Sequence, residues 1–123
     1  MEKKTWKVAV IGCGSFAQLQ YLPNISKEAN AETVAVVDVN PEFTHSIAEK
    51  YGIPNWYTTV EELIEQCDFE IAIDAASIQQ HHAINMAVLG AGKHLISQKP
   101  AAETVEEISE QIELAKKNHV EFV

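Results

Sequence analysis

Two glycines and an alanine, Gly12, Gly14 and Ala17, are spaced as Gly-x-Gly-x-x-Ala directly after a run of four apolar residues. The first glycine of such a loop permits a tight turn, the second lets a pyrophosphate approach the backbone, and the small third residue lets a helix pack closely on the preceding strand. The N–H groups at the start of that helix then face the phosphates. The loop, with Ser15 and Phe16 inside it, therefore predicts a dinucleotide-binding site. The alternative is a tight turn that binds no ligand.

An acidic residue, Asp38, ends the apolar run TVAVVD, about 20 residues after the glycine loop, as in dinucleotide-binding domains. A carboxylate at that position accepts hydrogen bonds from the ribose hydroxyls of the adenosine half and repels a 2′-phosphate. The chain contains no arginine that could receive such a phosphate, and the neighbouring Val39 carries no charge. We therefore predict that Asp38 and Val39 bind the adenosine half and that NAD is preferred over NADP. The alternative is that Asp38 only caps the helix that begins at Pro41.

Strand-like and helix-like segments alternate along the chain. Near-continuous apolar runs are typical of strands that are buried on both faces of a parallel sheet. They predict strands over residues 5–12, 33–38, 55–57, 69–76 and 94–98, and the beginning of a sixth over residues 120–123. Helices are expected over residues 16–29, 41–51, 59–67, 80–90 and 104–118. This order predicts one dinucleotide-binding domain over residues 1–123, with a Rossmann-type, doubly wound, mostly parallel six-stranded α/β sheet flanked by helices.

Three of the expected helices carry start signals. Pro41 suits the first turn of a helix. Thr59 and Thr104 are each followed three residues later by a glutamate, which is the capping-box pattern. The apolar residues of the last helix lie on one stripe, as in an amphipathic helix: Val105, Ile108, Ile112 and Ala115.

Charge and composition restrict the classes of partner. The formal net charge of −9 disfavours nucleic acid, because phosphate binding requires a basic face. No apolar run approaches the ~20 residues that a membrane-spanning helix needs, so we expect no membrane insertion. The two cysteines, Cys13 and Cys67, have neither metal-binding nor redox spacing. This favours a cytoplasmic protein with reduced thiols and no metal site.

Three segments resemble the N-terminal NAD-binding domain of the Gfo/Idh/MocA oxidoreductases, the family of glucose–fructose oxidoreductase and inositol 2-dehydrogenase. They are the glycine loop with VVD downstream, YGIPNWYTTVEELIE over residues 51–65, and HHAINMAVLGAGKHLISQKP over residues 81–100. The resemblance covers essentially the whole chain, and AGKH…KP is its most specific part. It implies an NAD-dependent dehydrogenase that transfers hydride between nicotinamide and a sugar- or polyol-like substrate.

The resemblance also implies roles for individual residues. Lys99 corresponds to the family's catalytic lysine beside the nicotinamide, where it orients a substrate hydroxyl or shares its proton. His81, or the neighbouring His82 as the alternative, corresponds to a histidine that lines the cofactor groove or caps the fourth helix. Ala76 and Ser77 lie in the loop that passes the nicotinamide half, and Gln98 directly precedes the lysine.

Departures from the family pattern bear on catalysis more than on cofactor binding. Gln98 stands where the family has a glutamate, so it cannot hold the lysine by charge. Ala76, Ser77 and Ile78 stand where the family has Thr-Pro-Asn, so hydrogen-bonding groups are altered or lost. Asp74 stands where the family has an apolar residue; it either faces the crevice or is partly buried with a raised pKa.

The family continues into a second domain, which supplies most of the substrate pocket and usually the oligomer interface. The short last strand favours a fragment or a truncated gene product of such a longer protein; the alternative is a naturally short chain. We therefore expect this chain to bind NAD without turnover, to meet a small-molecule substrate only with a second domain, and to self-associate only in the full-length protein. The alternative is a non-catalytic dinucleotide-binding sensor or interaction module. Asp38 disfavours a CoA-binding domain, because CoA carries a 3′-phosphate on its ribose.

Overall fold

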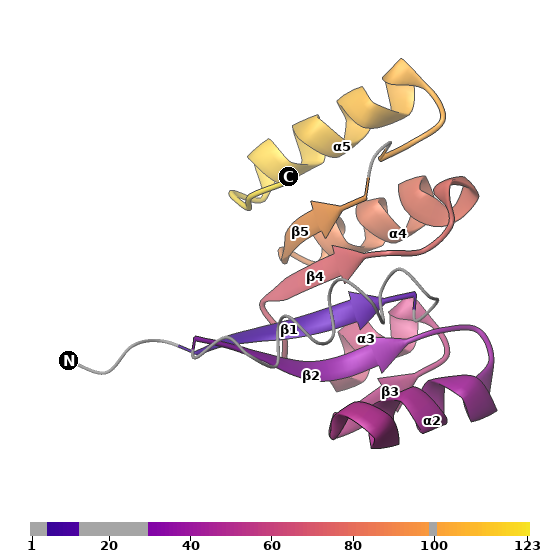
Figure 1. The fold of residues 1–123 in the computed structure, drawn as a ribbon. Helices are drawn as coiled ribbons and strands as arrows, with labels where there is room; N and C mark the ends of the chain where they lie inside the picture. Colours follow the sequence, from indigo (N-terminus) through magenta and orange to yellow (C-terminus); the bar gives the residue numbers. More distant parts are fainter. Residues whose placement is uncertain (1–4, 13–29, 99–100) are drawn as a thin grey trace.

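The computed structural model describes residues 5–12, 30–98 and 101–123 of the chain. Within them, five strands form one parallel sheet in the order β3-β2-β1-β4-β5 (Figure 1). The strands are β1 Trp6–Ile11, β2 Ala31–Val37, β3 Asn55–Tyr57, β4 Ile71–Asp74 and β5 His94–Ser97. The helices are α2 Pro41–Tyr51, α3 Val60–Gln66, α4 Ile78–Gly90 and α5 Val105–Lys117. The predicted Rossmann-type α/β sheet is confirmed.

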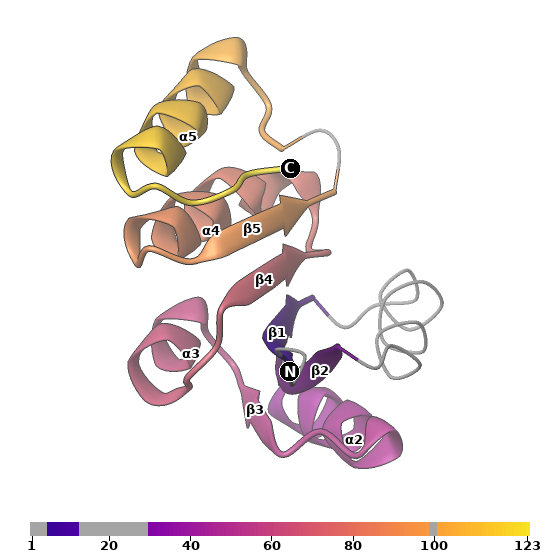
Figure 2. The same ribbon diagram turned by 90° about the vertical axis from the view of Figure 1, so that its left-hand side faces the viewer.

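Both faces of the sheet are covered, which explains why its strands are almost continuously apolar. Val8 and Val10 of β1 pack in one core cluster with Ile47 of α2. Ala9 and Ile11 alternate with them and pack in a second cluster with residues of α3, α4 and α5. Figure 2 shows α3 and α4 on one side of the sheet and α2 on the other. Because side chains alternate along a strand, β1 contributes to both clusters.

The predicted helix starts at Thr59 and Thr104 are confirmed. The hydroxyl oxygen of Thr59 accepts a hydrogen bond from the Glu62 N–H at 3.1 Å. The hydroxyl oxygen of Thr104 accepts one from the Glu107 N–H at 3.2 Å. Each threonine is extended and satisfies one of the N–H groups that a helix leaves without an internal partner, so α3 and α5 begin directly after it.

Helix α2 has the predicted bounds, but its cap differs from the alternative raised for Asp38. The N-cap is Asn40, whose Oδ1 accepts a hydrogen bond from the Phe43 N–H at 2.9 Å. At the other end, Gly52 takes a left-handed conformation with φ of 66°, as is common at helix C-termini. The interpretation of Asp38 as only a helix cap is therefore wrong.

Some boundaries differ from those expected. Helix α4 begins at Ile78 rather than at residue 80, because Ser77 takes the N-cap position. Strand β4 covers residues 71–74 rather than 69–76, and β2 begins at residue 31 rather than 33. Six strands are not confirmed: in the part of the chain that the structure describes, a single parallel bridge joins Leu95 of β5 to Phe122. The expected helix over residues 16–29 lies outside the described residues.

The apolar stripe of α5 is buried only in part. Val105 is 74% exposed and Ile112 is 41% exposed, whereas Gln111 and Ala115 are buried. Helix α5 packs against α4, and this contact includes a polar pair, because the side-chain amides of Asn85 and Gln111 meet at 3.0 Å. The partner across the helix–helix contact, rather than the apolar pattern, decides which face of α5 is buried.

Strands β1 and β4 are neighbours in the centre of the sheet, but the chain continues from them in opposite directions. Strand β2 lies beside β1 on one side, and β5 lies beside β4 on the other. In an open parallel sheet, this reversal leaves a crevice at the carboxyl ends of the two strands. Their last residues, Ile11 and Asp74, are paired there. The fold thus places the candidate site residues around one crevice.

Candidate functional site

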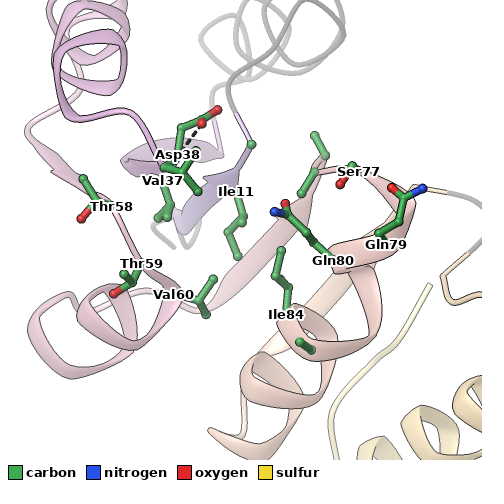
Figure 3. Close-up of a pocket in the computed structure, with 15 residues that line it drawn as sticks. Ile11, Val37, Asp38, Thr58, Thr59, Val60, Ser77, Gln79, Gln80 and Ile84 are labelled. Carbon is green, nitrogen blue, oxygen red and sulfur yellow. Dashed lines mark hydrogen bonds between the residues drawn. The ribbon is translucent and has the colours of Figure 1, made fainter.

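A cavity of about 570 Å³ opens at the carboxyl ends of the strands. Its volume falls within the roughly 300–1,000 Å³ of small-molecule and cofactor sites. Its wall is formed by the ends of β1 and β2, by the loop between β3 and α3 with the start of α3, and by the loop between β4 and α4 with the first turns of α4 (Figure 3). The lining residues are Ile11, Gly12, Val37, Asp38, Val39, Thr58, Thr59, Val60, Ala75, Ala76, Ser77, Gln79, Gln80, Ala83 and Ile84.

Gly12 marks a close approach between two backbone segments in this wall. It has a φ of 91°, and its N–H donates a hydrogen bond to the Val37 carbonyl at 2.7 Å. A Cβ on Gly12 would lie 2.7 Å from the backbone nitrogen of Ala76 and 2.8 Å from the carbonyl carbon of Ala75. The position therefore admits only glycine, both for its conformation and for space. It also leaves bare backbone at the cavity, as the first glycine of a dinucleotide loop does.

Asp38 lies at the end of β2 and is half-buried. Its Oδ1 accepts a hydrogen bond from the Val39 N–H at 2.7 Å, the dashed line in Figure 3. Its backbone N–H donates to the Tyr57 carbonyl at 3.2 Å, and its carbonyl accepts from the Thr44 hydroxyl at 3.1 Å. These bonds fix the backbone that presents the carboxylate. Among the described residues that line the cavity, Asp38 is the only charged one.

The loop between β4 and α4 forms the opposite rim of the cavity. Its Ala76 N–H donates a hydrogen bond to Asp74 Oδ1 at 3.0 Å. Its Ala76 carbonyl lies 2.7 Å from His81 Nε2. Ser77 is exposed at the N-cap of α4, and its side chain makes no capping hydrogen bond. The first turn of α4 thus opens onto the cavity, from where its N–H groups could bind an anionic ligand.

Asp74 and His81 lie behind this rim rather than in it. Asp74 is fully buried and His81 is 2% exposed, and neither lines the cavity. Burial raises the pKa of Asp74 to about 6, although the Ala76 N–H and His81 both act to lower it. Of the two alternatives for Asp74, burial with a raised pKa is therefore the one observed. For His81, the structure places the imidazole on the Ala76 carbonyl, so that it supports the loop instead of lining the groove.

Apart from His82, the structure describes only Gln98 among the remaining candidate residues. Gln98 is half-buried, and its N–H donates to the Asp74 carbonyl at 3.1 Å, but it does not line the cavity. The others lie outside the described residues: Gly14, Ser15, Phe16, Ala17 and Lys99. The structure thus brings together Gly12, Asp38, Val39, Ala76 and Ser77.

Sequence reasoning missed the contribution of the loop between β3 and α3. Thr58, Thr59 and Val60 line the cavity beside Asp38. It also missed Gln80 and Ile84 in the first turns of α4. A signal was present, because residues that follow neighbouring parallel strands meet at one edge of a sheet. Because the strand over residues 55–57 was predicted, Thr58 and Thr59 could have been assigned to this edge.

Comparison with known proteins identifies the family. The model of the Gfo/Idh/MocA family, described as an oxidoreductase family with an NAD-binding Rossmann fold, matches residues 6–123. The chain belongs to this family. The matched region is the NAD-binding Rossmann domain of these oxidoreductases, which confirms the family suggested by the three sequence segments.

The relatives include sugar and inositol dehydrogenases. Inositol 2-dehydrogenase of Salmonella typhimurium is 29% identical over 115 residues, which cover 93% of this chain and 34% of that protein. Glucose-6-phosphate 3-dehydrogenase of Bacillus subtilis is 31% identical over 103 residues, covering 84% of this chain and 28% of that protein. The chain thus spans about a third of the length of such relatives.

Solved structures share the fold. Scyllo-inositol dehydrogenase from Lactobacillus casei, with bound NAD(H) and scyllo-inositol, gives a TM-score of 0.90 at 21% identity, over 98% of this chain and 36% of that one. A probable dehydrogenase from Thermotoga maritima gives 0.88 at 26% identity, over 94% of this chain and 34% of that one. In the described ranges of our structure, no helix has the length and apolar character needed to span a bilayer.

Proposed function

We propose that this Gfo/Idh/MocA domain binds NAD(H) in the cavity between β1 and β4, with a preference over NADP(H), and serves hydride transfer between nicotinamide and an alcohol carbon of a sugar- or polyol-like substrate. The observation that carries the proposal is the pair of features on the cavity wall: bare backbone at Gly12 and a carboxylate at Asp38. Gly12 suits the pyrophosphate side and Asp38 the adenosine ribose.

The preference for NAD follows from charge. A 2′-phosphate carries roughly two negative charges. Each would interact unfavourably with the Asp38 carboxylate by about 1 kcal/mol at ~4 Å in water. The sum of about 2 kcal/mol corresponds to roughly 30-fold in affinity. The chain has no arginine to offset this repulsion.

Several groups of this chain would hold the cofactor. The carboxylate of Asp38 would accept hydrogen bonds from the ribose hydroxyls, with Val39 and Thr58 beside it. The first turn of α4, at Ser77, would offer N–H groups to the other end of the ligand. The predicted loop residues Gly14, Ser15, Phe16 and Ala17 would complete the phosphate side. When bound, NAD supplies a ring that accepts or donates hydride.

Lys99 is proposed as the catalytic residue, on the basis of the family resemblance alone. A lysine in that place orients a substrate hydroxyl and holds or releases its proton. Gln98, in place of a glutamate, would support the lysine by hydrogen bonding but not by charge. The proposed substrate class rests on the names of relatives, an inositol 2-dehydrogenase and a glucose-6-phosphate 3-dehydrogenase.

Turnover is expected to require residues beyond the matched domain, because substrate must be held in near-attack geometry. We therefore expect this chain alone to bind NAD without oxidising polyols, sugars or inositols. Self-association is proposed only for a form of the protein that carries a second domain. A cytoplasmic location, expected from the cysteine usage, is part of the same proposal.

The test is a calorimetric titration of the chain with NADH and with NADPH. We expect NADH to bind at least tenfold more tightly, and Asp38→Asn to narrow the difference because the amide removes the repulsive charge. Asp68→Asn is the matched control, since Asp68 is exposed and pairs with Lys7 away from the cavity. Equal affinity for the two cofactors, or a difference that survives Asp38→Asn, would overturn the proposed preference.

A second candidate, a non-catalytic dinucleotide-binding sensor, is favoured by Gln98 and by the loop at residues 76–78. The two functions differ in turnover when the domain acts together with a substrate domain. An NADH-formation assay with polyols and sugars, with Lys99→Ala as control, separates them. A rate that Lys99→Ala abolishes supports the dehydrogenase, and NAD binding with no rate supports the sensor.

A further inference from the structure

A group of buried polar side chains lies beside the cavity but outside its wall. Asp74 ends β4, His81 and Asn85 lie on α4, and Gln111 lies on α5; each is at most 2% exposed. Burial of polar groups is unfavourable unless each donor and acceptor finds a partner. The hydrogen bonds of this group therefore determine its state.

These side chains form a series of hydrogen bonds that runs from the loop after β4 to the loop after β5. Asp74 Oδ1 accepts from the Ala76 N–H at 3.0 Å, on the rim of the cavity. The Asn85 amide lies 2.7 Å from Asp74 Oδ2. On its other side Asn85 contacts Gln111 at 3.0 Å, and Gln111 Nε2 donates to the Ala101 carbonyl at 3.2 Å. This series of hydrogen bonds thus connects the backbone at Ala76 to the backbone at Ala101.

Between Asp74 and Ala101, donors and acceptors match in one orientation of Asn85, in which the Asn85 Oδ1 also lies 3.3 Å from the His81 carbonyl oxygen. Asn85 Nδ2 donates to Gln111 Oε1 at 3.0 Å and to Ser97 Oγ at 3.1 Å. The Asn85 Oδ1 then faces Asp74 Oδ2 at 2.7 Å. Two oxygen acceptors can lie this close only when a proton sits between them. The arrangement therefore requires Asp74 in its protonated form.

The opposite orientation of Asn85 suits an ionised Asp74 but creates a conflict further along. Turning the amide lets Asn85 donate to Asp74 Oδ2 at 2.7 Å, but its oxygen then faces Gln111 Oε1 at 3.0 Å. Turning Gln111 as well would bring its oxygen within 3.2 Å of the Ala101 carbonyl. In either case two acceptor oxygens face one another. Ionisation of Asp74 therefore removes one hydrogen bond from the series that joins Ala76 to Ala101.

We propose that Asp74 is a proton-controlled positioning residue: when protonated, it donates to Asn85 and completes the hydrogen-bond chain that joins Ala76 to Ala101, and when ionised it turns Asn85 and breaks the link to Gln111. The raised pKa of Asp74, about 6, agrees with this geometry. The proton would thus control how firmly the cavity rim is held against the loop after β5.

The charged and titratable surroundings of Asp74 are few in the residues that the structure describes. From α4, His81 Nε2 lies 3.8 Å from Asp74 Oδ1. Further along, His82 Nδ1 contacts the Gln111 amide, and His82 Nε2 lies 3.4 Å from Glu110 of α5. Strand β1 contributes the apolar Ile11, β5 an uncharged serine hydroxyl, and α5 an uncharged amide at the network. His81 is thus the competing titratable group next to Asp74.

The test is a pH titration of the whole chain by nuclear magnetic resonance, following the Asp74 carboxyl carbon and the Asn85 side-chain amide. We expect both signals to titrate with one midpoint near 6. Asp74→Asn should abolish the titration of the Asn85 amide, because the new amide donates to Asn85 at every pH. Asp68→Asn, an exposed aspartate, should leave it unchanged. This titration needs no cofactor.

An Asp74 carboxyl that titrates near its ordinary value of about 4 would overturn the proposal. An Asn85 amide that still titrates in Asp74→Asn would also overturn it and would assign the titration to His81.

The coupling to cofactor rests on the proposed function. Bound NADH is anionic and should favour uncharged Asp74, so its Kd should rise about threefold from low to neutral pH if binding raises the Asp74 pKa by half a unit. No NADH binding at any pH would refute the proposed function and leave the amide titration to decide the network.

Discussion

Replacement of Asp74 by asparagine should stabilise the chain at neutral pH and have little effect in acid. Asp74 is fully buried, and burial raises its pKa from 3.8 to about 6. The unfolded chain therefore loses this proton at lower pH than the folded chain does. Between about pH 4 and pH 6 the folded state binds more protons, so its stability falls as pH rises through this range. An asparagine makes the same hydrogen bonds as the protonated acid without titrating.

The size of the effect follows from the pKa difference. A shift from 3.8 to about 6, at 1.36 kcal/mol for each pKa unit, gives about 3 kcal/mol. The contribution of protonated Asp74 to the free energy of unfolding is fully present below the Asp74 pKa of the unfolded chain. It is fully lost above the Asp74 pKa of the folded chain. For a domain of this size, about 3 kcal/mol corresponds to a change in Tm on the order of 10 °C.

Urea unfolding of the wild-type chain and of Asp74→Asn at about pH 4 and about pH 7.5 measures this difference. The stability of the variant relative to wild type should increase by about 3 kcal/mol between the two pH values. Other groups titrate in both proteins and cancel in the comparison. A difference that does not change with pH, or a variant less stable than wild type at neutral pH, would refute the reasoning.

Other substitutions test the cavity wall and the helix caps. Gly12→Ala should destabilise the chain by roughly 3 kcal/mol in urea unfolding, because its Cβ would meet backbone atoms at 2.7–2.9 Å and its φ is 91°. Gly52→Ala is the control with a positive φ but no atom within 4 Å, and it should cost only about 1–2 kcal/mol; equal losses would show that the close approach at Gly12 is unimportant. Thr104→Ala should cost about 1 kcal/mol by loss of the α5 cap, and Thr104→Ser should restore most of it. A Thr104→Ala variant as stable as wild type would contradict the capping role.

Local signals in the sequence predicted much of the fold. The near-continuous apolar runs located β1, β2 and β4, because strands buried on both faces need apolar side chains at nearly every position. The strands predicted at β3 and β5 are also present, although their residues are buried only in part. Thr59 and Thr104 located two helix starts because a cap depends on residues only three apart. Asp38 was placed at the cavity because it directly follows a strand end.

Features that depend on contacts between distant segments could not be predicted in this way. Asn85 and Gln111 are buried because they face one another across α4 and α5, 26 positions apart. For the same reason Val105 and Ile112 are exposed although they fit an apolar stripe. The role of His81 behind the rim depends on how the loop after β4 folds back over α4, which no short pattern encodes.

The central claim, that the crevice between β1 and β4 holds the dinucleotide, is tested most directly by backbone amide chemical shifts on addition of NADH. We expect the largest changes at residues that line the cavity from separate segments, such as Gly12, Asp38 and Ala76. Residues of a second cavity of about 420 Å³, including Gly52 and Ile53, serve as an internal control and should not shift. Shifts confined to the second cavity, or the absence of any saturable change, would contradict the assignment of the cofactor site.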